Sequence, residues 1–496
     1  MINKLFVNTM PFTYTHFKLN LMAIAVIYLF FGCDQSLGQG TITARGSVEL
    51  GSVVDDTEVG RNADGFLGLE DGAQVFTSGV DVGIGGVGDL FLSGIGTNYQ
   101  SGGTASVGFL NVGRLTIEDG ASFRSKAMEI GDRSGSTGFV EVNGRVSRLS
   151  VGNEIVIGKA GLGEMRLSDG GNVTTAKIAV NGRLAGDGTI SGIRGDSFGG
   201  VQVSSSGEIT SAAGENLSFI GGVVTNLGRI ESIGTTSFLS EMTFDSSVTS
   251  SGQIISRNAV MRFDGGLTNE GDLLASFGTS DIQGDINNTG RIIVTGGAQA
   301  TFYDDIVQNG TLRVSATDTT SSVAVFAGDF SGSGGATGGG DIFFEGGFSP
   351  GNSPGLVEYD TDLFFSPSSM LEFELAGLEP GTEYDRVVVN GDVVLDGTLD
   401  VLLLDDFDPL ASSIFDIVIA DSIQDNGTEF QFPTLDNGRL FSSSIFTSGN
   451  RDILRLTVTA IPEPGTTAVL LMLSCFAFVN RPRRKATAVR ERIKKS

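Results

Sequence analysis

Carboxylates in glycine-rich turns are the residues of this chain whose types and spacing suit the binding of a metal ion. Asp119 and Asp169 each stand directly before a glycine that ends a short apolar segment, and Glu118 precedes the first of them. Carboxylate oxygens are ligands that calcium prefers. Aspartate before glycine is also ordinary turn chemistry, because both residues tolerate the left-handed backbone conformation. We therefore predict turns at these positions, with a calcium site as the alternative.

A denser acidic group lies further along the chain. Asp405, Asp406 and Asp408 are followed by Pro409, a composition that favours a turn. A weak surface site for a cation is again the alternative. The sequence thus predicts no cofactor, and calcium is the one candidate metal.

The usual groups of covalent and acid–base catalysis are missing from the body of the chain. The single histidine, His16, and both cysteines, Cys33 and Cys475, lie near the two ends. Segment 83–88 has the spacing of a dinucleotide-binding fingerprint, but another strand-like stretch follows it instead of a helix. Segment 351–355 has the spacing of a nucleophile elbow, but proline follows its serine. We interpret both segments as turns, and the sequence favours a protein that is not an enzyme.

Charge narrows the range of partners. The formal net charge of the 496-residue chain is −26, although its C-terminal end is basic. An acidic body repels nucleic acid, so nucleic-acid binding is not expected. A glycosidase needs two carboxyl groups that face one groove, and the sequence singles out no such pair.

Glycines recur at regular intervals in two series, each closing a short segment of alternating apolar residues. The first series stands at 72, 94, 120, 144 and 170, with steps of 22, 26, 24 and 26 residues. The second stands at 228, 252, 271, 290 and 310, with steps of 24, 19, 19 and 20 residues. Periods in this range are typical of stacked repeats, in which each unit packs only on its neighbours. Coils of about 20 residues suit a parallel β-helix.

The alternation within each repeat predicts strands that share one core. The residues expected to face this core include Leu115, Ile117, Phe139, Val142, Met165 and Leu167. Asparagines stand beside the glycines of the second series at Asn226, Asn269, Asn288 and Asn309. Because asparagine side chains one coil apart can bond to each other, we expect a hydrogen-bonded ladder between the coils.

The two ends of the chain have the composition of targeting segments. Lys4 and Lys18 precede an apolar run at 21–31, which is the order of a secretory signal peptide and too short to span a bilayer. Cleavage after Gly38 would give a mature chain that starts at Gln39. Lipidation of Cys33, which follows Gly32 as in a lipoprotein signal, is the alternative.

The C-terminal end has three parts in a characteristic order. Pro462, Glu463 and Pro464 precede an apolar run at 468–479, and Arg481, Arg483 and Arg484 follow it. This order resembles the PEP-CTERM sorting signal of exported bacterial proteins. The resemblance implies export through the Sec machinery, recognition by an exosortase-type enzyme in the inner membrane, and release to the cell surface or extracellular matrix. A plain transmembrane anchor is the alternative, although a 12-residue run is short for a span.

The repeats resemble those of autotransporter-like and PEP-CTERM-associated surface proteins, which implies a right-handed parallel β-helix. The fold class is therefore all-β: such a solenoid, followed by a C-terminal β module that caps it, with terminal signal and sorting helices. The expected order is a signal peptide at 1–38, repeats of the first type at 39–192, repeats of the second type at 193–330, a Gly/Ser/Pro linker at 331–355, the β module at 356–460 and the sorting segment at 461–496.

These expectations favour an exported cell-surface or matrix protein with a structural or adhesive role. By the resemblance, extracellular polysaccharide is a candidate partner, and the C-terminal segment would contact the inner membrane before processing. Two alternatives stay open at this point. One is a polysaccharide lyase or hydrolase built on a β-helix, and the other is a cation-dependent polysaccharide-binding module.

Overall fold

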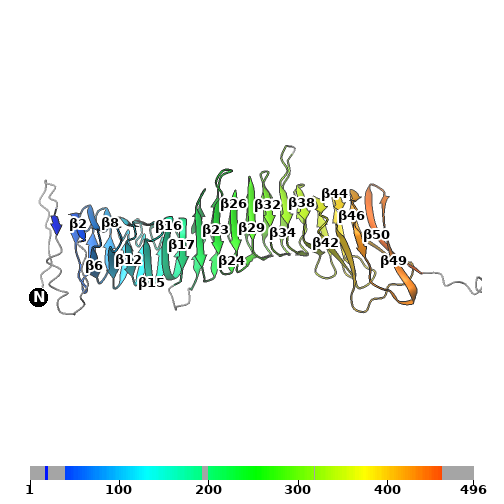
Figure 1. Ribbon diagram of the computed structural model, residues 1–496, viewed down its shortest axis with the longest axis horizontal. Helices are drawn as coiled ribbons and strands as arrows, with labels where there is room; N and C mark the ends of the chain where they lie inside the picture. The colour runs from blue at the N-terminus through cyan, green and yellow to red at the C-terminus, as the bar shows by residue number, and fades with distance from the viewer. Residues whose placement is uncertain (1–16, 20–39, 193–198, 318, 461–496) are drawn as a thin grey trace, which may run out of the picture.

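The computed structural model describes residues 17–19, 40–192, 199–317 and 319–460. Within these ranges the chain forms strands and one 3-10 turn, η2 (Asp436–Gly438), and no α-helix. The strands stack into an elongated rod with its N-terminal and C-terminal ends at opposite tips (Figure 1). The predicted all-β solenoid is therefore confirmed.

Each coil of the rod contributes one strand to each of three parallel sheets. Sheet 1 contains β4 (Thr57–Val59), β7 (Val80–Val82), β10 (Thr104–Val107), β13 (Ala127–Ile130), β18 (Val201–Val203), β21 (Val224–Asn226), β24 (Val248–Ser250), β27 (Leu267–Asn269), β30 (Ile286–Asn288), β33 (Ile306–Gln308), β36 (Phe330–Gly332), β39 (Gly347–Pro350), β42 (Met370–Leu375), β45 (Thr398–Leu403) and β48 (Glu429–Gln431). Sheet 2 contains β5 (Gly65–Glu70), β8 (Gly88–Ser93), β11 (Val112–Glu118), β14 (Thr137–Asn143), β19 (Glu208–Ser211), β22 (Arg229–Ile233), β25 (Gln253–Arg257), β28 (Asp272–Ser276), β31 (Arg291–Thr295), β34 (Thr311–Val314), β37 (Ala336–Thr337), β40 (Leu356–Tyr359), β43 (Arg386–Val389) and β46 (Ile414–Ala420). Sheet 3 contains β6 (Gln74–Thr77), β9 (Asn98–Ser101), β12 (Ser122–Ser125), β20 (Asn216–Ile220), β23 (Ser240–Phe244), β26 (Ala259–Phe263), β29 (Thr279–Gln283), β32 (Gln299–Phe302), β35 (Val323–Phe326), β38 (Asp341–Phe344), β41 (Asp362–Phe365), β44 (Asp392–Leu395) and β47 (Ser422–Asp425).

Three longer strands run around corners and join more than one sheet. They are β15 (Arg148–Ile157), β16 (Leu162–Val180) and β17 (Arg183–Ser191). β17 pairs in parallel with β19 of sheet 2 and β20 of sheet 3, so the ladder continues from the first type of repeat into the second.

The interior of the rod is filled by the alternate residues of every strand. Leu115 and Ile117 are buried as predicted, and so are Val142, Met165 and Leu167. Phe139 differs from the prediction, because Val140 takes the inward position and Phe139 lies on the outer face under the guanidinium of Arg114. Phenylalanines stack along the inside of sheet 3, where the rings of Phe302, Phe326, Phe344 and Phe365 follow one another at centroid distances of 5.1, 5.6 and 5.1 Å.

The expected ladder of asparagine side chains is present at the corner between sheets 1 and 2. Asn226, Asn269 and Asn288 are fully buried there. Asn269 Nδ2 donates to Asn288 Oδ1 at 2.6 Å, and Asn288 Nδ2 donates to Gln308 Oε1 at 2.6 Å. The fourth member is therefore Gln308, while the predicted Asn309 is exposed. Asn226 donates instead to Ser250 Oγ at 3.0 Å, and Asn269 Oδ1 and Gln308 Nε2 at the two ends of the ladder have no partner among the described residues. The coils are thus joined by side chains as well as by backbone.

Residues 331–355, which were expected to form a linker, instead contain most of β36 and all of β37, β38 and β39. Each of these strands pairs in parallel with a strand of the coil before and a strand of the coil after. Two glycines of this segment allow the chain to turn at the ends of strands: Gly332 ends β36 and Gly351 follows β39, both with positive φ. The solenoid is continuous through this part of the chain.

The C-terminal β module is likewise a continuation of the solenoid up to β48. Only the last two strands, β49 (Arg439–Ser448) and β50 (Arg451–Ala460), are antiparallel, and β50 joins them to β46 of sheet 2. At the other end β2 (Thr41–Gly46) is antiparallel to β5, with β1 (Phe17–Leu19) beside β2, and β3 (Val48–Glu49) is antiparallel to β4. Antiparallel strands thus close both ends, and the cap is smaller than predicted.

Candidate functional site

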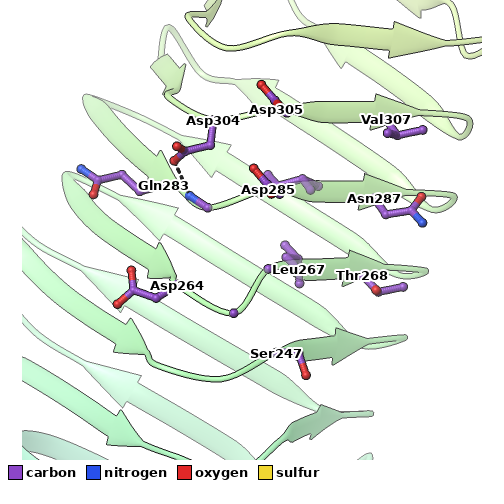
Figure 2. A pocket seen from close by; sticks show the side chains of 14 residues that line it. Ser247, Asp264, Leu267, Thr268, Gln283, Asp285, Asn287, Asp304, Asp305 and Val307 are labelled. Atoms are coloured by element: carbon purple, nitrogen blue, oxygen red, sulfur yellow. Dashed lines mark hydrogen bonds between the residues drawn. The ribbon is translucent and has the colours of Figure 1, made fainter.

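A shallow groove lies along the corner between sheets 3 and 1. Its volume is about 880 Å³, and it crosses the coils that contain β24, β27, β30 and β33. Figure 2 shows its two sides. Thr268, Asn287 and Val307 stand in one row on the outer face of sheet 1, in register from strand to strand. Asp264, Asp285, Asp304 and Asp305 stand at the corner.

Some of these carboxylates hold the corner together. Asp304 Oδ2 accepts a hydrogen bond from the backbone N–H of Gly284 at 2.6 Å, which joins two successive coils (Figure 2). Asp305 Oδ1 accepts one from the N–H of Asp329 on the next coil at 2.9 Å. The side chains of Asp264 and Asp285 accept no hydrogen bond within the described residues. The groove therefore presents two unengaged carboxylates, one coil apart.

The chemistry available in this groove is electrostatic. Its lining holds four aspartates and no lysine, arginine or histidine among the described residues. Such a surface attracts cations and repels anions. No group of three or more carboxylate, histidine or cysteine side chains in the described part of the chain is arranged to hold a metal ion. The groove can concentrate counter-ions, and its geometry does not define a coordination shell.

The structure does not bring Asp119 and Asp169 together. Asn143 of β14 pairs with Ser168, and Ile117 pairs with Val142, so a complete coil lies between the two aspartates. At about 4.8 Å per layer, that places their turns about 10 Å apart.

The two aspartates have the backbone of turn residues. Their φ angles are 52° and 49°, and the glycines after them have φ of 87° and 80°. Asp119 Oδ2 also accepts a hydrogen bond from Ser93 Oγ of the preceding coil at 2.9 Å. The turn predicted at Asp119 is confirmed. Asp169 instead lies within β16, at the irregularity between Leu167 and Gly171 where this strand goes round a corner. Calcium binding at these residues stays a prediction.

The acidic group at 405–408 also has a structural role. Asp405 and Asp406 are exposed turn residues with φ of 51° and 56°. Asp408 instead forms an ion pair with Arg439, whose side chain is only 7% exposed. The same guanidinium donates to the backbone carbonyls of Pro409 and Asp436. Arg439 thus fastens the loop after β45 to the beginning of β49.

Two carboxyl groups outside the groove are markedly perturbed. Burial raises the pKa of Asp81 to about 6, with smaller contributions from nearby acids that include Asp56 and Glu58. Burial raises the pKa of Asp385 to about 7. Asp385 Oδ1 accepts from the N–H of Gly355 at 2.6 Å, and Oδ2 accepts from the N–H of Glu374 at 2.8 Å. This arrangement holds a corner in place, because both oxygens face backbone donors.

Both motif-like segments are turns, as predicted. Segment 83–88 leads into β8, so no helix follows it. Segment 351–355 connects β39 to β40, and Ser353 Oγ donates to Glu374 Oε2 at 2.5 Å.

The candidate residues of the targeting segments lie outside the described residues. These are Cys33, Pro462, Glu463, Pro464, Arg481, Arg483 and Arg484. In the described part of the chain, no helix has the length and apolar character needed to cross a membrane.

Comparison with known proteins gives no assignment, since neither a family model nor a curated protein matches the chain.

The acidic corner was not found from the sequence, although a signal for it exists. Asp245, Asp264, Asp285, Asp305 and Asp329 follow each other at 19, 21, 20 and 24 residues, close to the repeat period. Each follows the end of a sheet 3 strand by one to three residues. Aligning these five aspartates with the repeat period would have predicted that they lie at one corner of the solenoid.

Proposed function

We propose that this protein is an exported structural rod of the cell surface or extracellular matrix, delivered by its PEP-CTERM-like C-terminal segment. The observation that carries the proposal is the continuity of the solenoid. Parallel pairing runs coil by coil from β4 to β48, through the segments that the sequence suggested were separate. A chain built this way has one rigid long axis and a large regular surface, which suits a spacer or scaffold.

The interior of the rod supports this proposal. The ladder of buried amides binds coil to coil, and the glycines beside it allow close stacking. A Cβ on Gly271 would lie 2.0 Å from the carbonyl oxygen of Gly252, and one on Gly290 would lie 2.2 Å from that of Gly271. Such contacts exclude any side chain, so the sequence is specialised for stacking at these positions.

The alternatives have less support in the described residues. A glycosidase needs an acid and a second carboxylate that flank a bound sugar. The outward rings of Phe343 and Phe364 stack on each other, with centroids 4.6 Å apart and planes 13° apart. Rings that face each other in this way present mainly their edges to the solvent, which is poor for stacking against a sugar. The acidic groove fits a cation-dependent binding module only through its charge.

The experiment that tests the proposal is fractionation of the cells that produce the full chain, with mass spectrometry of both termini. We expect a mature chain that starts at Gln39 and ends before Arg481, recovered outside the inner membrane. The variant Pro464→Ala should retain the tail, and its matched control Pro367→Ala, an exposed proline in the turn after β41, should be processed normally.

A chain that is intact through Ser496 and remains in the inner membrane would contradict the sorting proposal. It would instead indicate a membrane-anchored protein. Recovery of a chain acylated at Cys33 would indicate that the protein is anchored by a lipid at its N-terminal end and is not released from the membrane.

A further inference from the structure

The outermost strand at the C-terminal tip of the rod has a free edge. β49 is ten residues long and pairs with β50 along its whole length. Apart from β50, no strand in the described residues pairs with β49, which lies at the extreme end of the rod (Figure 1). Its other edge therefore presents backbone N–H and C=O groups that another strand can bind.

This edge lacks the features that normally prevent pairing. Natural edge strands are protected by lysine, proline, bulges or short length. From Leu440 to Asn450 the chain contains no charged residue and no proline, and its one glycine, Gly449, lies beyond the strand. Leu440 is 55% exposed, and Ser442 and Ser444 are exposed beside it. A long, uncharged edge of this kind favours strand addition.

Three arginines near this edge are paired within the chain, whereas the carboxylates of Asp436 and Asp452 have no cationic partner among the described residues. Arg451 pairs with Asp421 at 3.2 Å and Arg455 with Asp416 at 2.6 Å, while Arg439 is engaged by the loop after β45. The tip therefore carries only a small part of the molecule's net charge of −26. Two such rods repel each other when they lie side by side, and they repel least when only their tips meet.

We propose that the β49 edge binds the β49 edge of a second copy of this chain. Two identical antiparallel strands meet around a two-fold axis, so each contact is made twice and no charge faces its own copy. The two rods then extend away from the joint. The competing occupant is the chain's own C-terminal segment, but Pro462 and Pro464, which follow β50 closely, have no N–H to donate. This proposal is independent of how the protein is exported.

Sedimentation velocity of the full chain over a range of concentrations tests the proposal. We expect a concentration-dependent species of twice the 51.6 kDa chain mass. The double variant Ser442→Lys/Ser444→Lys places like charges at the joint and should raise the dissociation constant at least about tenfold. Its matched control, Gln202→Lys/Thr225→Lys, adds the same charge to exposed positions of sheet 1 away from both the tip and the acidic groove, and should leave the dimer unchanged. Equal melting temperatures for both variants would show that the fold is intact.

A second measurement distinguishes tip-to-tip pairing from other modes. In a Cys33→Ser/Cys475→Ser background, spin labels at Ser444→Cys should couple between the two copies, and labels at Thr225→Cys should not. A monomer at all concentrations would overturn the proposal, as would a dimer that is insensitive to the lysines or lacks coupling at residue 444. A chain that dimerises only when it ends at Ala460 would also overturn it, because the tail would then be the occupant of the edge.

Discussion

Asp81 shows how stacking concentrates charge at a single residue. It lies in β7, in register with Glu58 of the preceding coil, and burial raises its pKa to about 6. Because the folded pKa exceeds the ordinary value of 3.8, the folded chain binds this proton more tightly than the unfolded chain. The stabilisation from the bound proton is complete below about pH 4. It is lost as the pH rises through about 6.

The variant Asp81→Asn should therefore stabilise the protein at pH 8 and have little effect at pH 4. The expected gain is about 1–2 kcal/mol, since solvent screens a group that is only partly buried. Urea unfolding at both pH values measures it. The control Asp264→Asn removes an exposed carboxylate and should show a much smaller pH dependence. A gain of equal size at pH 4 and pH 8 would contradict the explanation, because it could not come from titration of Asp81.

At the scale of the element, the amide ladder offers a test between two neighbouring residues. Asn288 is fully buried and bonds to Asn269 and Gln308, while Asn287 beside it points outward into the groove. Asn288→Ala should lower the free energy of unfolding by about 2–4 kcal/mol, because it leaves the buried Gln308 Oε1 unpaired and creates a cavity.

The matched control Asn287→Ala should change the free energy of unfolding by less than about 0.5 kcal/mol. Equilibrium urea unfolding with the fluorescence of an added dye or with circular dichroism measures both variants. Similar losses for the two asparagines would mean that the ladder does not stabilise the stacked coils.

The sequence predicted this ladder and the Asp-Gly turns because both depend on residue type at a fixed spacing. It did not predict the continuity of the solenoid at 331–355, where short strands of two to four residues leave little alternation between glycines and serines. Paired residues lie 19 apart at Ser250 and Asn269 but 30 apart at Tyr359 and Val389. Extra residues at the corners therefore made the last coils resemble a separate module.

The acidic groove and the free edge of β49 were harder to predict, because each depends on which residues meet after coiling. Phe139 shows the same limit within one strand. Phe139 and Val140 are adjacent and both apolar, so composition does not decide which faces inward. In the structure Gly138, Val140 and Val142 are the residues of β14 that face the core.

At the scale of the whole molecule, stacking turns each repeated acid into a row of like charges one coil apart. The corner between sheets 3 and 1 carries such a row, and the chain as a whole has a net charge of −26. Repulsion along a row opposes the compact state, and salt screens it. The Debye length falls from about 30 Å at 0.01 M to about 8 Å at 0.15 M ionic strength, so the repulsion between successive coils weakens within that range.

We therefore expect the melting temperature to rise with sodium chloride between these ionic strengths, by about 1–3 °C. The variant Asp264→Asn/Asp285→Asn, which removes the two unengaged carboxylates of the groove, should melt higher at low salt and gain less from added salt. Calcium chloride at equal ionic strength provides the comparison. If its effect equals that of sodium chloride, the row acts only through its field, whereas a larger effect that the double variant abolishes would mean that the groove binds calcium directly. A melting temperature that is indifferent to salt would contradict the premise that repulsion between stacked acids opposes folding of the rod.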